Sequence, residues 1–275
     1  MPERPALIYC YDGSFEGLLC CMHESLQKDE LPMDIMPQGA DLPLLLPVRL
    51  IETDAECARN VRKAIPQKMG REAWTVIRHA FLSCHPQKEL LMLCFLRQGF
   101  RYGPSVMNRL TDEEVAPLIK AVEYLEGEAA LYRGFVRFSE SRGALTARIE
   151  PKNIVLPLVA RHFCDRYPGE QFLIHDRTHD MVLVHRRGRW AIASVEELQL
   201  PDPGEEELMF RSLWQLYYDT IEIKERHNPR CRMNLVPKRY WNCMTELARE
   251  VNAVDPFLPP SSPSKPRLPS APDEV

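Results

Sequence analysis

The sequence lacks any catalytic motif of high specificity. No apolar run approaches the roughly 18 residues that a membrane span requires. The first ten residues, MPERPALIYC, do not form a signal peptide, because Glu3 interrupts the charged region and the apolar run is short. We therefore expect a cytoplasmic protein. Its composition, 45% hydrophobic and 27% charged, is typical of a globular chain with ample material for a core.

The nine cysteines show no recognised pattern. No C-x-x-C pair occurs, so the spacing supports neither a zinc ribbon nor a local iron–sulfur loop. Their odd number and the missing secretion signal argue against a disulfide framework. Most of these thiols lie in apolar surroundings and are interpreted as small core residues. No metal or other cofactor is predicted.

The hydrophobic pattern predicts an α+β fold that opens with a short strand–helix unit. Residues 7–11 form an apolar run rich in β formers, and Ser14 is the expected N-cap of a helix over 15–26. Residues 32–47 are crowded with Pro and Gly and are expected to form a loop before a second strand over 48–52.

A helical region is expected over about 54–128, followed by a β-rich region over about 131–195. The helical region comprises a helix capped by Thr53 or Asp54 and interrupted at Pro66 and Gly70, a helix over 90–100, and a helix opened by the capping box Thr111–Glu114. The β-rich region comprises strands over 135–139 and 145–149, a helix over 155–167, strands over 172–174 and 181–184, and a last strand over 190–193.

The C-terminal part begins with an acidic connector over 196–207, which carries six acids and no base. A long helix is expected over about 206–226, and Pro237 can occupy the first turn of a final helix running to about 251. We expect one compact domain over 1–254. The Pro-rich tail over 255–275 is too poor in apolar residues to pack and is expected to be disordered.

Asp12 is the candidate catalytic residue. It lies in a predicted strand-to-helix turn, where backbone amides converge and favour anions, so it could serve as a nucleophile or a metal ligand. The spacing matches neither a P-loop nor a dinucleotide fingerprint. An Asp before a helix is more often a cap or an Asx-turn residue, and that alternative stays open.

Histidine and cysteine pairs give weaker candidates. His175, Asp176, His179 and Asp180 lie close together on one hairpin, but no recognised ligand spacing is present and the loop has ordinary hairpin chemistry. Cys84 next to His85, and Cys20 and Cys21 near His23, place thiols beside imidazoles in sequence only. A thiolate nucleophile needs its base placed in space, so these residues are interpreted as structural.

The segment Arg226–Tyr240 is the most informative positive feature. It holds five cationic side chains and no acid, although the whole chain has a net charge of −4. Lys and Arg bind phosphate and aromatic rings stack on bases, so the segment predicts a nucleic-acid contact. The candidate residues are Arg226, Arg230, Arg232, Lys238, Arg239, Tyr240 and Trp241.

Internal pairing is the competing explanation for this segment. Its cations can complement the C-terminal dipole of the preceding helix or pair with the acidic connector. The phosphate-binding role therefore requires Arg230, Lys238 and Arg239 to be exposed rather than paired with Glu205–Glu207. A second basic region would strengthen the nucleic-acid interpretation if it shared a face with the first; it comprises Arg133, Arg137, Arg142, Arg148 and Lys152.

Two segments together resemble an uncharacterised bacterial family labelled "probable DNA metabolism protein". Leu7–Leu19, reading LIYCYDGSFEGLL, is similar to the opening of that family, and RHNPR at 226–230 with PKRYW at 237–241 is similar to its closing signature. The order of expected elements also fits, so the resemblance covers roughly residues 5–250.

The resemblance implies a role beside a radical-SAM protein proposed to act in DNA modification or repair. Some relatives carry a uracil-DNA-glycosylase-like domain, for which this chain has no room, and the chain lacks the C-x-x-x-C-x-x-C loop of a radical-SAM cluster. We therefore expect an accessory protein that contacts DNA and the radical-SAM partner. Two alternatives remain: an enzyme acting on a base, nucleotide or phosphoester at the Asp12 turn, and a structural adaptor without nucleic-acid contact.

Overall fold

The structure is a computed structural model that describes residues 5–40, 46–141, 143–196, 198, 200 and 203–248. The chain divides into two compact units, Met1–Glu207 and Leu208–Val275, which are described separately. Helices and sheets are both present, which confirms the α+β class. The expectation of one domain over 1–254 stays a prediction, and the Pro-rich tail lies outside the described residues.

The first unit opens with a three-stranded parallel sheet of order β2-β1-β3. β1 (Ile8–Tyr11) is buried along its whole length and lies between β2 (Asp34–Pro37) and β3 (Val48–Leu50). The prediction of a loop over 32–47 was wrong where β2 forms. This strand is a short edge strand, and Pro37 pairs at its end, where a missing N–H interrupts no continuing ladder.

Two long helices follow the first and third strands. α1 (Phe15–Lys28) begins at Ser14, whose side chain accepts the Gly17 N–H as expected of an N-cap. α2 (Ala55–Leu82) is capped by Asp54. Pro66 does not interrupt α2, contrary to expectation. The backbone leaves helical angles only at Gly70, whose φ of 89° is accessible to a residue without Cβ.

The helical region continues through α3 (Lys88–Tyr102), the 3-10 helix η1 (Gly103–Asn108) and α4 (Ala116–Phe135). The predicted capping box at 111–114 was wrong, because the α-helix starts later and has no side-chain cap. Asp112 accepts hydrogen bonds from the Glu114 N–H and Arg109 instead and organises the preceding turn. In the described part of the chain, no helix has the length and apolarity needed to cross a membrane.

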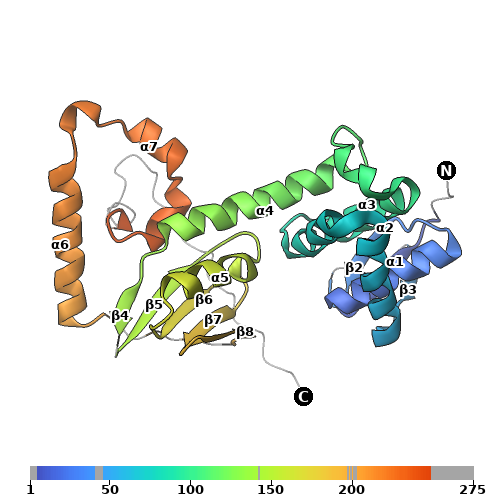
Figure 1. Ribbon diagram of the computed structural model, residues 1–275, viewed down its shortest axis with the longest axis horizontal. Helices are drawn as coiled ribbons and strands as arrows, with labels where there is room; N and C mark the ends of the chain where they lie inside the picture. Colours follow the sequence, from blue (N-terminus) through green and yellow to red (C-terminus); the bar gives the residue numbers. More distant parts are fainter. Residues whose placement is uncertain are drawn as a thin grey trace, which may run out of the picture. The chain divides into compact units, whose positions relative to one another are not determined.

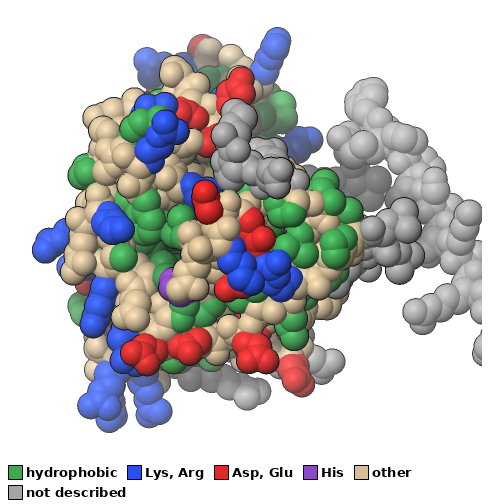
Figure 2. All heavy atoms as spheres, turned by 90° about the vertical axis from the view of Figure 1, so that its right-hand side faces the viewer, with side chains coloured by type: hydrophobic (Ala, Val, Ile, Leu, Met, Phe, Trp, Pro, Cys, Tyr) green, Lys and Arg blue, Asp and Glu red, His purple; other side chains and the backbone are tan. Residues whose placement is uncertain are grey.

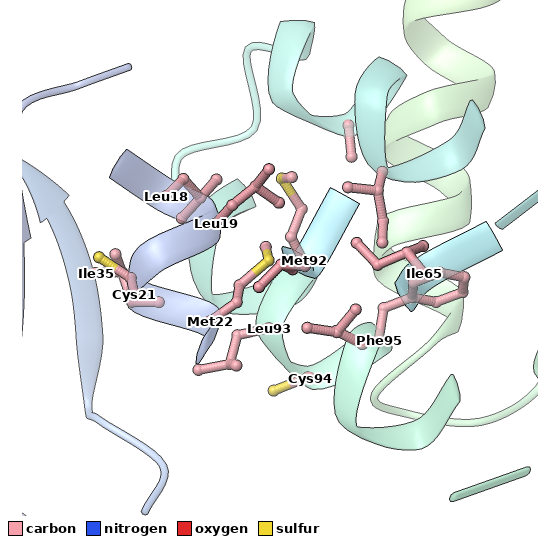
Figure 3. Close-up of a cluster of buried hydrophobic side chains, with 14 of the residues drawn as sticks. Leu18, Leu19, Cys21, Met22, Ile35, Ile65, Met92, Leu93, Cys94 and Phe95 are labelled. Atoms are coloured by element: carbon pink, nitrogen blue, oxygen red, sulfur yellow. The ribbon is translucent and has the colours of Figure 1, made fainter. Parts of the chain in front are cut away.

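The core of this region forms where α1, α2 and α3 pack against the small sheet. Figure 3 shows Met22 of α1 directed toward Met92 of α3, whereas Cys21 lies beside Ile35 of β2 and Phe95 of α3 lies beside Ile65 of α2. Each of these side chains is almost fully buried. The helical apolar spacing thus selects the face of each helix that meets its neighbours.

α4 connects the helical region to a five-stranded sheet of order β4-β5-β6-β7-β8 (Figure 1). β5 and β6 are parallel and joined through α5, and the other pairs are antiparallel. The first strand was predicted too early, because α4 continues to Phe135. The elements are β4 (Ser139–Ser141), β5 (Ala144–Ile149), α5 (Leu156–Arg166), β6 (Phe172–Asp176), β7 (Met181–Arg186) and β8 (Arg189–Ser194).

The second unit is built on α6 (Glu205–Ile221), whose first turn belongs to the end of the first unit. It is followed by the 3-10 helix η2 (Lys224–Arg226) and by α7 (Pro229–Leu235). The predicted helix over 206–226 ends five residues early. The final helix predicted from Pro237 is a 3-10 helix, η3 (Lys238–Cys243), and the residues after 248 lie outside the described part.

Candidate nucleic-acid interface

Asp12 lies in the turn after β1, at the carboxyl end of the central strand of the parallel sheet. Its Oδ1 accepts hydrogen bonds from the Ser14 backbone N–H at 2.9 Å and the Ser14 hydroxyl at 2.7 Å, and its Oδ2 accepts one from the Thr53 hydroxyl at 2.8 Å. These hydrogen bonds, those from Ser14 first, lower the pKa of the Asp12 carboxyl. The bond from the Ser14 N–H makes Asp12 an Asx-turn residue, and the bond from the Thr53 hydroxyl joins this turn to the segment after β3.

Gly17 is fitted to this arrangement. A Cβ at Gly17 would collide with the Asp12 carboxylate and lie 2.7 Å from Thr53 Oγ1. The first turn of α1 therefore packs directly on the hydrogen-bonded pair. The geometry accounts for Asp12 as a structural residue, and its role as a nucleophile or metal ligand stays a prediction.

The cysteines of the thiol–imidazole pairs differ in burial. Cys20 and Cys21 are buried in the core of α1. Cys84 is exposed beside a cavity of about 720 Å³ between the α2–α3 turn and α4, and His85 also lines this cavity. The His85 Nδ1 accepts the Gln87 N–H at 3.2 Å, which holds the ring within its own turn.

The histidines and aspartates of the β6–β7 hairpin do not all lie on the same face of the sheet. Asp176 is buried and accepts hydrogen bonds from the Thr178 and His179 N–H groups, and its Oδ2 lies 2.8 Å from His179 Nδ1. His175, its neighbour on β6, points to the other face, and the His185 Nδ1 donates to the Glu170 carbonyl. Among the described residues, no group of three or more His, Cys, Asp and Glu could hold a metal ion.

The predicted basic segment lies in the second unit, over η2, α7 and η3. Asn228 caps α7 by accepting the Cys231 N–H at 3.0 Å. Arg232 is half-buried, whereas Arg226, Arg230, Lys238 and Arg239 are exposed. In the described part of this unit, Arg226, Arg230 and Lys238 form no ion pair, so their charges face solvent.

The two aromatic residues of the segment pack inward. Tyr240 and Trp241 are only 0% and 4% exposed, so neither ring presents an open face to a base. The Trp241 Nε1–H donates to the Val236 carbonyl at 2.9 Å. The guanidinium of Arg232 and the ammonium of Lys238 lie 5.2 and 5.8 Å from the Trp241 ring centroid. The rings therefore position the cations.

A depression of about 590 Å³ adjoins the segment. Arg226 and Arg232 line it, but so do Glu222 and Glu225, and Glu222 also binds His227. Phosphate would meet both carboxylates there. The surface suited to an anion is therefore the outward side of the segment, where Arg230 and Lys238 are exposed.

The second predicted basic region lies in the first unit and is partly engaged. The guanidinium of Arg137 donates to the Gly134 carbonyl at 2.9 Å, and that of Arg148 donates to the Leu200 carbonyl at 3.1 Å. Arg142 lies outside the described residues. Elsewhere on this unit, the face in Figure 2 has acidic, basic and apolar side chains interspersed, without one dominant charge.

Two groups were missed by sequence reasoning. Glu128 is buried on α4 and binds the loop before α5, although nothing in the helical pattern distinguishes it from a surface glutamate. The turn between β7 and β8 gathers exposed arginines at its tip, next to Trp190. The local sequence RRGRW, with three Arg around one Gly, was the signal for the second group.

Comparison with protein families gives a match over more than half of the chain. Residues 86–246, from the start of α3 to the turn after η3, match the model of a domain of unknown function, DUF4130. No curated protein and no solved structure matches the chain. The match includes the basic segment and excludes Asp12. Because it spans more than half of the 275 residues, the chain belongs to the DUF4130 family.

Proposed function

We propose that the protein is an accessory factor in DNA metabolism whose second unit contacts nucleic-acid phosphates. The observation that carries the proposal is the exposure of Arg226, Arg230 and Lys238 without an ion pair in the described part of that unit. Residues 208–248 contain seven Lys or Arg and four Asp or Glu, so the unit is basic within an acidic chain. Cations that are not neutralised internally are available to replace the counterions of a phosphate backbone.

The burial of Tyr240 and Trp241 restricts this contact to the backbone. Without an exposed ring, the segment has no means of stacking on bases. Phosphate contacts position a protein on nucleic acid but carry no sequence information. The second unit is therefore proposed to bind DNA without sequence preference and with steep salt dependence.

The proposed protein partner, a radical-SAM protein, follows from the sequence resemblance, and the surface of α6 supports a partner of some kind. No residue of α6 is buried, although Leu213, Leu216 and Tyr217 are large and apolar. Apolar side chains gathered on one exposed element commonly mark a protein interface. This observation equally favours the adaptor function, in which the partner contact alone matters.

The DNA contact is tested with the variant Arg230→Gln/Lys238→Gln/Arg226→Gln of the full chain. We expect its affinity for labelled DNA at low salt to fall about tenfold or more, because three phosphate contacts are lost. Each lost contact should also reduce the magnitude of the slope of log K against log salt by about 0.7–0.9. Fluorescence anisotropy at several salt concentrations measures both quantities.

The matched control is Arg59→Gln/Arg71→Gln/Arg78→Gln, which removes three exposed arginines from α2. If general charge alone governed binding, the two triple variants would weaken it equally. Wild-type affinity in the second-unit variant would contradict the proposed contact.

The partner contact is tested by co-expression with the radical-SAM protein and size-exclusion chromatography. We expect a complex that survives high salt and nuclease, because apolar burial is not screened by ions. Leu216→Lys, at a side chain 62% exposed, should abolish the complex without unfolding the protein. Leu50→Lys, on β3 and 57% exposed, is the control that should leave the complex intact. A complex that dissolves with nuclease would refute a direct contact.

A further inference from the structure

The β7–β8 hairpin ends in a two-residue turn made of Arg187 and Gly188. Arg186 pairs directly with Arg189 across the turn, and the two central residues have φ angles of 51° and 73°. Two consecutive positive φ angles define the tight turn that matches the twist of the flanking strands. The tip therefore carries three arginines within four residues on a rigid hairpin.

Arg187 occupies a position that does not favour arginine. The first central position of this turn is preferred by Asn, Asp and Gly, because other residues bring Cβ close to the backbone when φ is positive. A non-glycine residue held there is conformationally strained. The turn is thus less stable than it would be with Asn at this position. What Arg187 contributes in place of stability is an additional guanidinium group at the tip.

All three guanidinium groups at the tip face solvent. Arg186, Arg187 and Arg189 are exposed, and in the part of the chain that the structure describes they make no ion pair. An acid, Glu170, lies at this end of the sheet, where its backbone carbonyl accepts the His185 Nδ1–H at 2.8 Å. The tip remains a concentrated positive charge.

Trp190 supplies an aromatic ring directly beside these charges. It is 50% exposed and pairs across the strands with His185. The His185 ring stacks on Phe172, with centroids 4.8 Å apart and planes inclined by 20°. Cross-strand neighbours of this kind restrict each other's rotamers. The outermost ring of the row, Trp190, is therefore both ordered and accessible.

We propose that the β7–β8 tip is a binding site for single-stranded nucleic acid. Arg186, Arg187 and Arg189 would bind successive phosphates, and a base would stack on Trp190. Positive charge that follows a backbone, combined with an exposed ring, is the arrangement that binds single strands without sequence preference. The basic segment of the second unit has exposed charge, but its own two rings, Tyr240 and Trp241, are buried, so the stacking role is assigned to Trp190 at the β7–β8 tip.

This inference rests on the proposed nucleic-acid function but uses a different surface, and separate variants distinguish the two. The hairpin variant is Arg186→Gln/Arg187→Asn/Arg189→Gln, and its control is the α2 triple variant already described. The probe is a fluorescein-labelled oligothymidylate. We expect the hairpin variant to bind about tenfold or more weakly at low salt and its salt slope to fall by about 2, while the control stays near wild type.

The single variant Arg187→Asn separates charge from structure. Asn suits the turn, so the melting temperature should stay the same or rise while affinity for the oligonucleotide falls. Trp190→Val keeps a strand-forming residue and removes the ring, and it should weaken single-strand binding about tenfold with little change for duplex DNA.

Equal affinity of the hairpin variant and the α2 control would overturn the site, even if the second-unit variant still lost binding. Unchanged single-strand affinity in Trp190→Val would overturn the stacking role. Conversely, loss of binding in the hairpin variant with wild-type binding in the second-unit variant would sustain this site and refute the contact proposed for the second unit.

Discussion

Replacing Glu128 with Ala is expected to reduce the free energy of unfolding by about 3 kcal/mol or more. Glu128 is 2% exposed, and its carboxylate accepts hydrogen bonds from the Lys152 N–H at 3.1 Å, the Asn153 N–H at 2.8 Å and the Asn153 Nδ2–H at 2.6 Å. Removing the carboxylate leaves these three N–H groups without their acceptor. Each buried donor that lacks a partner reduces the free energy of unfolding by about 1–3 kcal/mol. Urea denaturation measures the change.

The loss of stability in Glu128→Ala should extend beyond α4, because Asn153 connects the Glu128 carboxylate to a further hydrogen bond. Its Oδ1 accepts the Cys84 N–H at 2.8 Å, so the Glu128 carboxylate indirectly holds the α2–α3 turn. Glu128→Gln keeps one acceptor oxygen and should cost less than Ala. Glu123→Ala, at an exposed position of the same helix, should cost little. Similar losses for Glu123→Ala and Glu128→Ala would refute the network.

The imidazole of His179 is expected to make stability depend on pH. Its hydrogen bond with Asp176 raises its pKa above the ordinary value, and the Lys152 carbonyl and the Glu128 charge act in the same direction, while burial opposes them. A raised pKa in the folded state means that the protonated ring stabilises the fold. This contribution is complete below the unfolded pKa of about 6.5 and is lost as pH rises through the folded value.

The measurement is the difference in unfolding free energy between wild type and His179→Ala across this range. A hydrogen bond to a charged group contributes about 1.5–3 kcal/mol, which sets the expected size of the difference at the acidic end. Asp176→Asn removes the carboxylate that raises the pKa and should weaken the pH dependence. A difference that grows as pH rises would contradict the assigned sign.

The order of elements in the first unit was predictable because it depends on local patterns. Ser14 and Asp54 cap helices in the structure as their sequence positions indicated, and the strands predicted over 181–184 and 190–193 form the β7–β8 hairpin. Each of these signals is contained within a few residues. The formation of β2 depends instead on pairing with β1, which is distant in sequence, and the local Pro-rich composition therefore led to the wrong prediction of a loop.

The candidate site was predicted in charge but not in burial. The excess of cations over 226–240 is a property of the sequence, but the sequence left open whether these cations are exposed or paired internally. The burial of Tyr240 and Trp241 could not, because it depends on how the η3 turn packs. The same residue type is half-exposed at Trp190, since that strand lies at the edge of the sheet.

The sequence by itself determined the α+β class, most element positions and the basic character of the second unit, because propensity, periodicity and net charge are local or additive. Tertiary structure alone decided which charges are buried and which rings are accessible. Glu128 and Glu123 lie on the same helix, yet only Glu128 is buried, because the loop at 152–153 reaches that side of α4. Long-range packing sets the environment of each side chain, and the environment determines whether a charge holds the fold together or remains available to a ligand.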